Sequence, residues 1–294
     1  MLKSFFKRQA TNVQRFLGTY DVVKVQSIQQ EREYDRVRES VAKQYPGSLA
    51  LFGHKVYSQT DEDGIIEEIF NRIPNNKRFL EIGIQTGIEC NTLHLLLQGW
   101  KGTWVEGSEK YCKIIADTLN GLQFKNKLQV VNSFIDRDNI LDIFKQADHF
   151  FASSQTELDF FSLDIDGNDF YIMEQLLVNG YTPKVVCVEY NAKFRPPLDI
   201  RIKYNKTHVW DGTDYQGCSL QSYINLFAAH QYSLVCCNIP GNNAFFVRNE
   251  YATLFTLYNA TEFYQPCRYH LCPITLAHKP SLHYLKAMLE EQTG

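Results

Sequence analysis

Apolar residues along this chain alternate between short continuous runs and longer stretches in which they recur at helical spacing. From Arg78 onward, the runs predict strands near 79–83, 102–106, 127–132, 159–165 and 184–190, and the helical stretches lie near 89–98, 109–120, 137–146 and 169–179. Strands that alternate with helices of this length are typical of βαβ units. The pattern therefore predicts an α/β fold with a mostly parallel sheet.

The alternation stops after Tyr190. Residues 191–217 form a long polar and aromatic loop, and loops of this length in compact domains are usually functional or disordered. A helix at 219–230 then leads to strands at 232–237 and 244–248, joined by the turn Pro240-Gly-Asn-Asn243. Such a turn indicates a hairpin, so the last strand should enter the sheet antiparallel. The prediction is a Rossmann-like sheet of seven strands with an antiparallel last strand.

Three parts of the chain are expected: a helical N-terminal extension (1–50), a central domain (51–250) and a C-terminal extension packed on that domain (251–294). The central domain should begin with a helix, because Ser58-Gln-Thr-Asp61 resembles a capping box and isoleucines at helical spacing follow it. No segment has the apolar length needed to span a bilayer.

The first 18 residues combine apolar positions at helical spacing with basic residues between them and no acid. A basic amphipathic helix of this kind can lie on a membrane surface or act as a transit peptide. It can also pack on its own domain or on a second copy of the chain in a homo-oligomer. The sequence leaves these alternatives open.

Composition excludes several classes of protein. The 294 residues are 44% hydrophobic and 21% charged, as in ordinary globular chains. The net charge of −3 gives no general attraction to nucleic acid or to an anionic membrane. Eight cysteines are irregularly placed and no secretory segment precedes them, which favours reduced thiols in a cytoplasmic protein.

The most informative stretch is Phe79-Leu-Glu-Ile-Gly-Ile-Gln-Thr-Gly87, an apolar strand that runs into a glycine-bearing turn. Parallel sheets bind ligands where strands deliver their carboxyl ends, and glycine lets the backbone approach the ligand. The next strand ends at Glu106, which is placed to accept hydrogen bonds from a ribose. These features predict a site for a cofactor that contains a nucleoside.

The turn also discriminates between cofactors. A dinucleotide fingerprint requires a middle glycine, where this chain has Gln85, and Glu89 at the predicted helix start is a poor neighbour for a pyrophosphate. Glu81 on the strand suits a cationic ligand instead. The order Glu81-x-Gly83-x-x-x-Gly87 resembles motif I of class I S-adenosylmethionine (SAM) methyltransferases, especially the FkbM-like branch. The alternatives are an ordinary βα turn and an NAD-linked enzyme, which the turn disfavours.

The cofactor-binding residues expected from this resemblance include weaker additions outside the turn. The full set is Gln59, Glu81, Gly83, Gly87, Asn91, Glu106, Ser133 and Asp164.

A second group of polar residues follows two later strands. Asp164 and Asp166 end one strand and precede Asp169, and Glu189 and Asn191 end the next. The carboxyl ends of parallel strands share one edge, so these oxygens should converge beside the cofactor. An oxygen-only set at Asp164, Asp166, Glu189 and Asn191 would select Mg²⁺, Ca²⁺ or Mn²⁺. Alternatively, Asp164 and Asp166 cap the following helix and contact the cofactor without a metal.

The same residues extend the resemblance. Asp164-x-Asp166-Gly-x-Asp169 is similar to the D-x-E-G-x-E of FkbM-like methyltransferases. Asp166 to Tyr171 also resembles, with one extra residue, the D-G-D-x-Y of metal-dependent sugar O-methyltransferases. That likeness implies Asp166 as a metal ligand and Asp169 as the base, and His208 in the long loop is an alternative base or acceptor contact. The resemblance runs from about Val56 to Arg248.

The resemblance implies a SAM-dependent O-methyltransferase acting on a sugar or glycan hydroxyl, either with or without assistance from Mg²⁺. A hydroxyl is too weak an acid to ionise unaided, so a carboxylate base, a hard cation or both are needed. A DNA-base methyltransferase is disfavoured, since no Asn/Asp-Pro-Pro-Tyr follows the fourth strand and no basic-aromatic stripe accompanies it. The remaining alternative is a non-catalytic methyltransferase-like scaffold or assembly protein.

Overall fold

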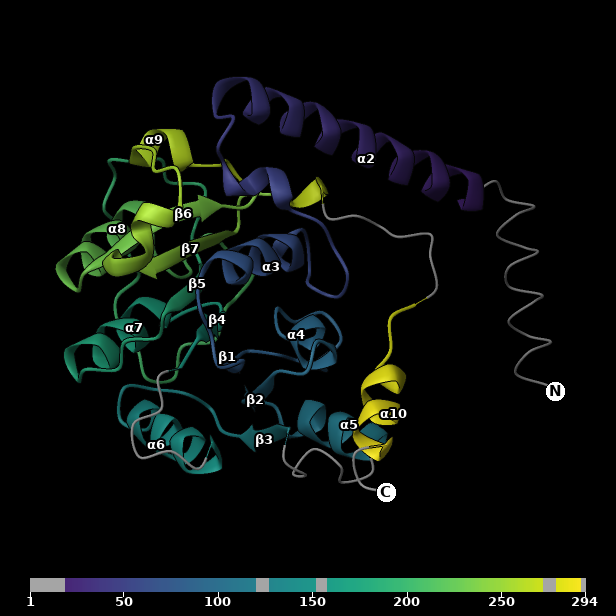
Figure 1. Cartoon of the computed structure of the whole chain (residues 1–294), viewed down its shortest axis with the longest axis vertical. Coiled ribbons are helices and arrows are strands. Elements are labelled where there is room, and N and C mark those ends of the chain that lie inside the picture. Colours follow the sequence, from purple (N-terminus) through teal and green to yellow (C-terminus); the bar gives the residue numbers. More distant parts are fainter. Residues whose placement is uncertain (1–18, 120–126, 152–157, 272–278, 292–294) are drawn as a thin grey trace.

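The computed structural model describes residues 19–119, 127–151, 158–271 and 279–291 (Figure 1). Its centre is a seven-stranded sheet with the order β3-β2-β1-β4-β5-β7-β6. The strands are β1 Arg78–Ile82, β2 Lys101–Glu106, β3 Leu128–Asn132, β4 Phe160–Leu163, β5 Val185–Glu189, β6 Tyr232–Cys237 and β7 Asn243–Arg248. The first five strands are parallel, and β7 is antiparallel to both β5 and β6. This is the class I methyltransferase fold that the sequence predicts.

Helices cover both faces of the sheet, because alternate residues of each strand point to opposite sides. One face packs against α3 Glu62–Arg72, α4 Leu93–Leu97, α5 Glu109–Leu119 and α10 His283–Glu291. The other packs against α6 Ile140–Phe151, α7 Asp169–Val178, α8 Leu220–Ala229 and α9 Ala260–Phe263. Short 3-10 helices complete the chain: η1 Leu49–Phe52, η3 Asn249–Leu254 and η4 Tyr269–Leu271.

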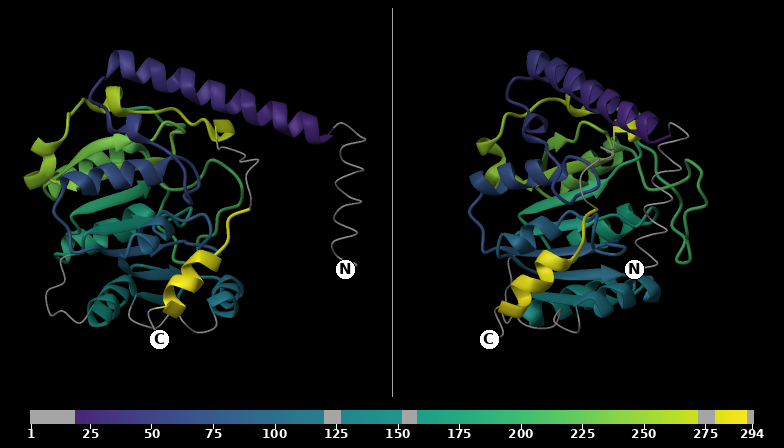
Figure 2. Two further views of the ribbon diagram at one scale, coloured as in Figure 1. Left: turned by 45° about the vertical axis from the view of Figure 1, so that its right-hand side comes forward. Right: turned by 90° about the vertical axis from the view of Figure 1, so that its right-hand side faces the viewer.

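Helix α2 Thr19–Gln44 forms most of the described N-terminal extension and projects beyond the body of the molecule (Figures 1 and 2). The Tyr34 hydroxyl fastens it to the body by donating to Asp61 Oδ2 at 2.8 Å. Among the described helices, none combines the length and apolarity needed to cross a bilayer. The amphipathic segment 1–18 lies outside the described residues.

Two helix starts differ from the sequence predictions. The capping box predicted at Ser58–Asp61 is wrong: α3 begins at Glu62, and its N-cap Asp61 makes no side-chain cap bond. Asp63 holds the preceding segment instead, because its Oδ2 accepts the backbone N–H groups of residues 56, 57 and 58. Helix α4 begins at Leu93 instead of residue 89, since the turn before it continues through Thr92.

The seven cysteines in the described parts of the chain are free thiols, in agreement with the prediction from the sequence.

Candidate cofactor and metal site

The turn after β1 has a backbone that only certain residues adopt easily. Gly83, Gln85 and Gly87 have φ angles of 90°, 50° and 72°. A Cβ at Gly83 would lie 1.7 Å from the carbonyl oxygen of Asp164, so any side chain there would force β1 and β4 apart. A Cβ at Gly87 would meet the Trp104 ring at 2.7 Å. The two predicted glycines therefore shape the turn, and Gly83 also lines the cavity described below.

Glu81 lies beneath this turn and holds it from inside. Its carboxylate accepts the Asn91 backbone N–H at 2.8 Å and the Thr92 hydroxyl at 2.5 Å. Thr92 in turn accepts from the Trp104 indole at 2.8 Å. Burial raises the pKa of Glu81 to about 7. The sequence suggested Glu81 as a contact for a cationic ligand, but the structure places its carboxylate among the backbone groups of the turn.

The raised pKa of Glu81 predicts a pH effect on stability. Burial disfavours the ionised form of Glu81. The stabilisation of the folded state by protonated Glu81 is therefore fully present below the unfolded pKa of about 4.5, and it is lost as pH rises through about 7. We expect Glu81→Gln, which imitates the protonated acid, to flatten the change in free energy of unfolding between pH 5 and pH 8 by about 1–3 kcal/mol. Urea denaturation at both pH values measures this, and parallel profiles for the two proteins would contradict it.

A cavity of about 490 Å³ opens at the carboxyl ends of β1, β2, β3 and β4. Glu106 lines it and accepts the backbone N–H groups of Gln85 at 2.7 Å and Ser108 at 2.8 Å. A carboxylate offers about four lone-pair positions, so two remain for further donors. Glu106 is thus held rigidly while retaining capacity for the two hydroxyls of a ribose.

The cavity contains apolar residues that the sequence reasoning missed. Phe134, which directly follows the predicted contact Ser133, lines the cavity with 51% of its surface exposed. Tyr111 of α5 lines it as well. An exposed aromatic ring in a cavity wall is suited to stacking on another flat ring. In the sequence, the feature that could have identified Phe134 was its position just after the third strand.

The acids predicted to converge do so in part. Asp164, Asp166 and Glu189 offer oxygen atoms that all lie within 4.8 Å of one another. We call these three residues the carboxylate cluster. Burial, together with the charges of neighbouring acids, raises the pKa values of Asp164 and Glu189 well above the ordinary range, and burial raises the pKa of Asp166. Carboxylates this close repel one another unless a proton or cation offsets the charge.

Asp169 and Asn191 lie outside the carboxylate cluster and shape its surroundings. Both Asp169 oxygens are occupied, accepting the backbone N–H groups of Ile165 at 2.9 Å and Gly167 at 2.8 Å. Asp169, which the sequence predicts as the base, is 2% exposed, and its carboxylate holds the β4–α7 turn. The Asn191 amide donates to the carbonyls of Asp214 and Gln216, which fixes the long loop.

The long loop 191–217 folds back over the end of β4. Asn168 donates to the Asn205 carbonyl at 2.8 Å and accepts from its N–H at 3.3 Å. These bonds bring His208 against Gly167, where a Cβ would be 2.5 Å from the imidazole. His208 lines the cavity at the ends of β1 to β4, which is called the cofactor cavity below. Its buried Nε2 has no hydrogen-bond partner among the described residues. A buried imidazole nitrogen without a partner is a candidate contact for a ligand.

The other residues predicted to contact the cofactor differ in whether they line the cavity. Ser133 lines the cavity. Gln59 is exposed on the segment before α3, where its carbonyl accepts from Lys55, and it is not part of the cavity wall. The Asn91 side chain donates to the Ser162 hydroxyl at 3.0 Å, which joins the turn to β4.

Comparisons with known proteins give only distant likenesses. No protein-family model matches the chain, and no curated protein matches it. Among solved structures, the chain is similar to a putative caffeoyl-CoA O-methyltransferase from Staphylococcus aureus, with 13% identity, a TM-score of 0.44, and coverage of 79% of this chain and 99% of that one. It is also similar to the N-terminal domain of EvdMO1 with SAH bound, at 11% identity, a TM-score of 0.40, and 72% and 94% coverage.

A third similar structure is the O-methyltransferase from Bacillus cereus in complex with SAH, at 15% identity, a TM-score of 0.39, and 74% and 89% coverage. Likenesses this distant carry no information on substrate. The fold assignment rests on the strand order and on the antiparallel β7.

Proposed function

We propose that this protein is a SAM-dependent O-methyltransferase that acts on a sugar or glycan hydroxyl. The observation that supports it most is the overlap of two features: Asp164 and Asp166 belong both to the wall of the cofactor cavity and to the carboxylate cluster. A nucleoside-bearing donor at Glu106 would therefore end beside acids suited to activating a hydroxyl. Membership of the FkbM-like branch, which the sequence motifs suggest, is part of the same proposal.

On the donor side, the protein supplies a preformed site. Glu106 would accept the ribose hydroxyls, and Phe134 would stack on the base. The turn at Gly83 lets the backbone pass close to the donor, and Glu81 keeps that turn in place from below. Since SAM already contains a good leaving group, the remaining work is to align the acceptor and expose its lone pair.

On the acceptor side, the carboxylate cluster would hold the hydroxyl and take its proton. Asp166 is the most exposed of the three acids, so it can reach an acceptor oxygen as a general base. The three carboxylates fit a hard divalent cation in ligand type and spacing, and bound Mg²⁺ would lower the pKa of the acceptor hydroxyl. Asp169 keeps the β4–α7 turn in the conformation that presents Asp166.

Calorimetric titration with S-adenosylhomocysteine, with and without Mg²⁺, tests the proposal. We expect one site per chain, and we expect Glu106→Ala to weaken binding by about 1–3 kcal/mol, because ribose hydroxyls would then lack an acceptor. Glu109→Ala is the matched control, since this exposed acid of α5 is not part of the cavity wall.

Two results would decide against the proposal. Binding of NADH without binding of S-adenosylhomocysteine would identify a dinucleotide enzyme. Failure of both ligands to bind would favour the non-catalytic scaffold.

A further inference from the structure

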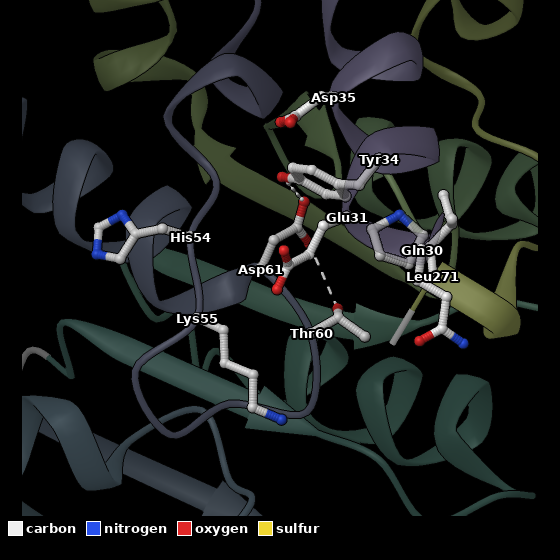
Figure 3. A pocket seen from close by; sticks show the side chains of 10 residues that line it. Gln30, Glu31, Tyr34, Asp35, His54, Lys55, Thr60, Asp61 and Leu271 are labelled. Carbon is white, nitrogen blue, oxygen red and sulfur yellow. Dashed lines mark hydrogen bonds between the residues drawn. The ribbon is translucent and has the colours of Figure 1, made fainter. Parts of the chain in front are cut away.

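A second cavity, of about 290 Å³, lies between α2 and the segment before α3, and we call it the α2 cavity. Figure 3 shows Asp61 in its wall, hydrogen-bonded to Tyr34 of α2. Four buried side chains that hydrogen-bond to one another separate this cavity from the carboxylate cluster: Thr60, Glu62, Asn238 and Asn243. A methyl acceptor in the α2 cavity would therefore not reach the acids, whereas the cofactor cavity contains Asp164 and Asp166 in its own wall.

The long loop 191–217 forms part of the cofactor cavity at the end where these two acids lie. His208 and Val209 belong to the cavity wall together with Asp164 and Asp166. The His208 imidazole packs on Gly167, which directly follows Asp166. A sugar ring beside Asp166 would therefore face the donor, the acids and the long loop within a single cavity.

Two aromatic rings continue the surface of the loop outward from this wall. Trp210 directly follows Val209 and is 48% exposed. Tyr215 is 54% exposed, and its ring meets that of His208 edge to face, with centroids 6.4 Å apart. Trp210 is thus connected to the cavity wall by the chain, and Tyr215 by a side-chain contact. We call Trp210 and Tyr215 the aromatic platform.

Hydrogen bonds within the loop hold both rings of the aromatic platform in place. The Trp210 indole N–H donates to the Thr213 carbonyl at 2.6 Å, and the Tyr215 hydroxyl accepts the backbone N–H of Lys203 at 3.1 Å. The Thr213 hydroxyl accepts the Tyr215 backbone N–H at 3.3 Å and donates to Asp211 at 2.6 Å. The polar atoms of the two side chains are therefore bonded inside the loop while the rings stay open to solvent. Rings fixed in this way lose little conformational entropy when a ligand stacks on them.

We propose that the methyl acceptor is a glycan of two or more sugar rings, and that the ring next to the methylated one stacks on the aromatic platform. The inference rests on the proposed function, and it adds a length for the acceptor and a location for its second ring. The ring to be methylated would lie beside Asp166, on the same side of the carboxylate cluster as the donor. A single sugar in the cavity would leave the platform in water.

The chemistry of the platform suits a sugar. One face of a pyranose ring consists largely of C–H groups, which pack on an aromatic face, and its hydroxyl groups point outward from the ring edge. Exposed carboxylates of Asp211 and Asp214 flank the platform in the loop and can accept from such hydroxyls. Two aromatic side chains bury about 300–500 Å² at most, which is less than the roughly 800 Å² per partner of a stable protein interface.

Quenching of tryptophan fluorescence by acrylamide tests the stacking directly. The chain has three tryptophans, and Trp210 is exposed while Trp100 and Trp104 are buried, so acrylamide reports mainly on Trp210. The full chain is loaded with S-adenosylhomocysteine and Mg²⁺ and mixed with cellotriose, chitotriose or α-1,6-mannotriose, or with the methyl glycoside of the matching monosaccharide. We expect at least one trisaccharide to protect Trp210 from acrylamide, and its monosaccharide not to do so.

Saturation-transfer NMR titrations then measure affinity. We expect the protecting trisaccharide to bind about tenfold or more tightly than its monosaccharide, because it also covers the platform. Trp210→Ala should remove this difference, and Trp210→Phe should retain most of it, since the flat ring stays. Tyr284→Ala is the matched control, because this exposed aromatic residue of α10 is not part of the cavity wall.

Three results would overturn the inference while S-adenosylhomocysteine still binds and the proposed function stands. The first is that none of the trisaccharides protects Trp210, and the second is that each monosaccharide binds as tightly as its trisaccharide. The third is protection of Trp210 that grows with protein concentration in the absence of sugar, which would show that a second copy of the chain covers the platform. If S-adenosylhomocysteine itself does not bind, the proposed function fails first.

Discussion

Asp166→Asn should lower methyl transfer to a glycan acceptor by roughly 10²-fold or more while leaving the affinity for S-adenosylhomocysteine largely unchanged. The amide keeps the size of the side chain but cannot take a proton and is a poorer ligand for a hard cation. Asp166 has a φ of 53°, a conformation that Asn tolerates well, so the backbone should not change. Transfer of a radiolabelled methyl group and calorimetry measure the two quantities.

Removal of the cation should imitate this variant. We expect EDTA to abolish turnover of the wild type and Mg²⁺ or Mn²⁺ to restore it. Asp142→Asn is a suitable control, because Asp142 is an exposed acid of α6 paired with Lys145. Full activity in EDTA would leave the carboxylate cluster as cofactor contacts and a general base without a metal. Full activity of Asp166→Asn would remove this acid from the mechanism and direct attention to His208.

Asp159→Ala should destabilise the fold by about 3–5 kcal/mol, because it removes the carboxylate that offsets the charge of a buried ammonium. Asp159 is 0% exposed and lies 2.9 Å from the Lys184 ammonium. Its other oxygen accepts the backbone N–H groups of Asn76 and Arg78, each at 2.9 Å. The carboxylate thus joins the amino ends of β1, β4 and β5. Urea denaturation at pH 7 measures the loss.

Replacing both charges tests the reason for that loss. The double variant Asp159→Leu, Lys184→Met should recover part of the stability, since no unpaired charge stays buried. S-adenosylhomocysteine should still bind the folded molecules, because the pair lies at the edge of the sheet opposite the cofactor cavity. A loss below about 1 kcal/mol for Asp159→Ala would contradict the argument.

Much of the fold could be predicted because apolar residues repeat with different periods in strands and in helices. The strand ends also carry recognisable residues, such as glycines, acids and turn formers. Glu106 was identified as a strand-terminal acid, and it lines the cavity at the carboxyl ends of the strands. The hairpin turn at Pro240 predicted the antiparallel β7 correctly. The start of α4 was misplaced, since the residues that delay it are held by Glu81 and Trp104, which lie on two different strands.

The side chains at the strand ends were harder to predict, because proximity along the chain does not give direction in space. Asp164, Asp166 and Asp169 appear equivalent in the sequence, yet Asp169 turns back to bind the backbone of its own loop. Asn191 likewise faces the long loop, and Glu189 from the neighbouring strand joins the cluster.

The sequence by itself determined the order of the elements, the edge of the sheet at which the polar residues gather and the glycine turn, because these depend on hydrophobic period and local backbone preference. Only the tertiary structure decided which acids meet, that His208 returns to Gly167, and that α2 encloses a second cavity beside Asp61. These features depend on contacts between residues far apart in the chain. Their geometry is set by packing of the whole sheet and its helices, which no local pattern encodes.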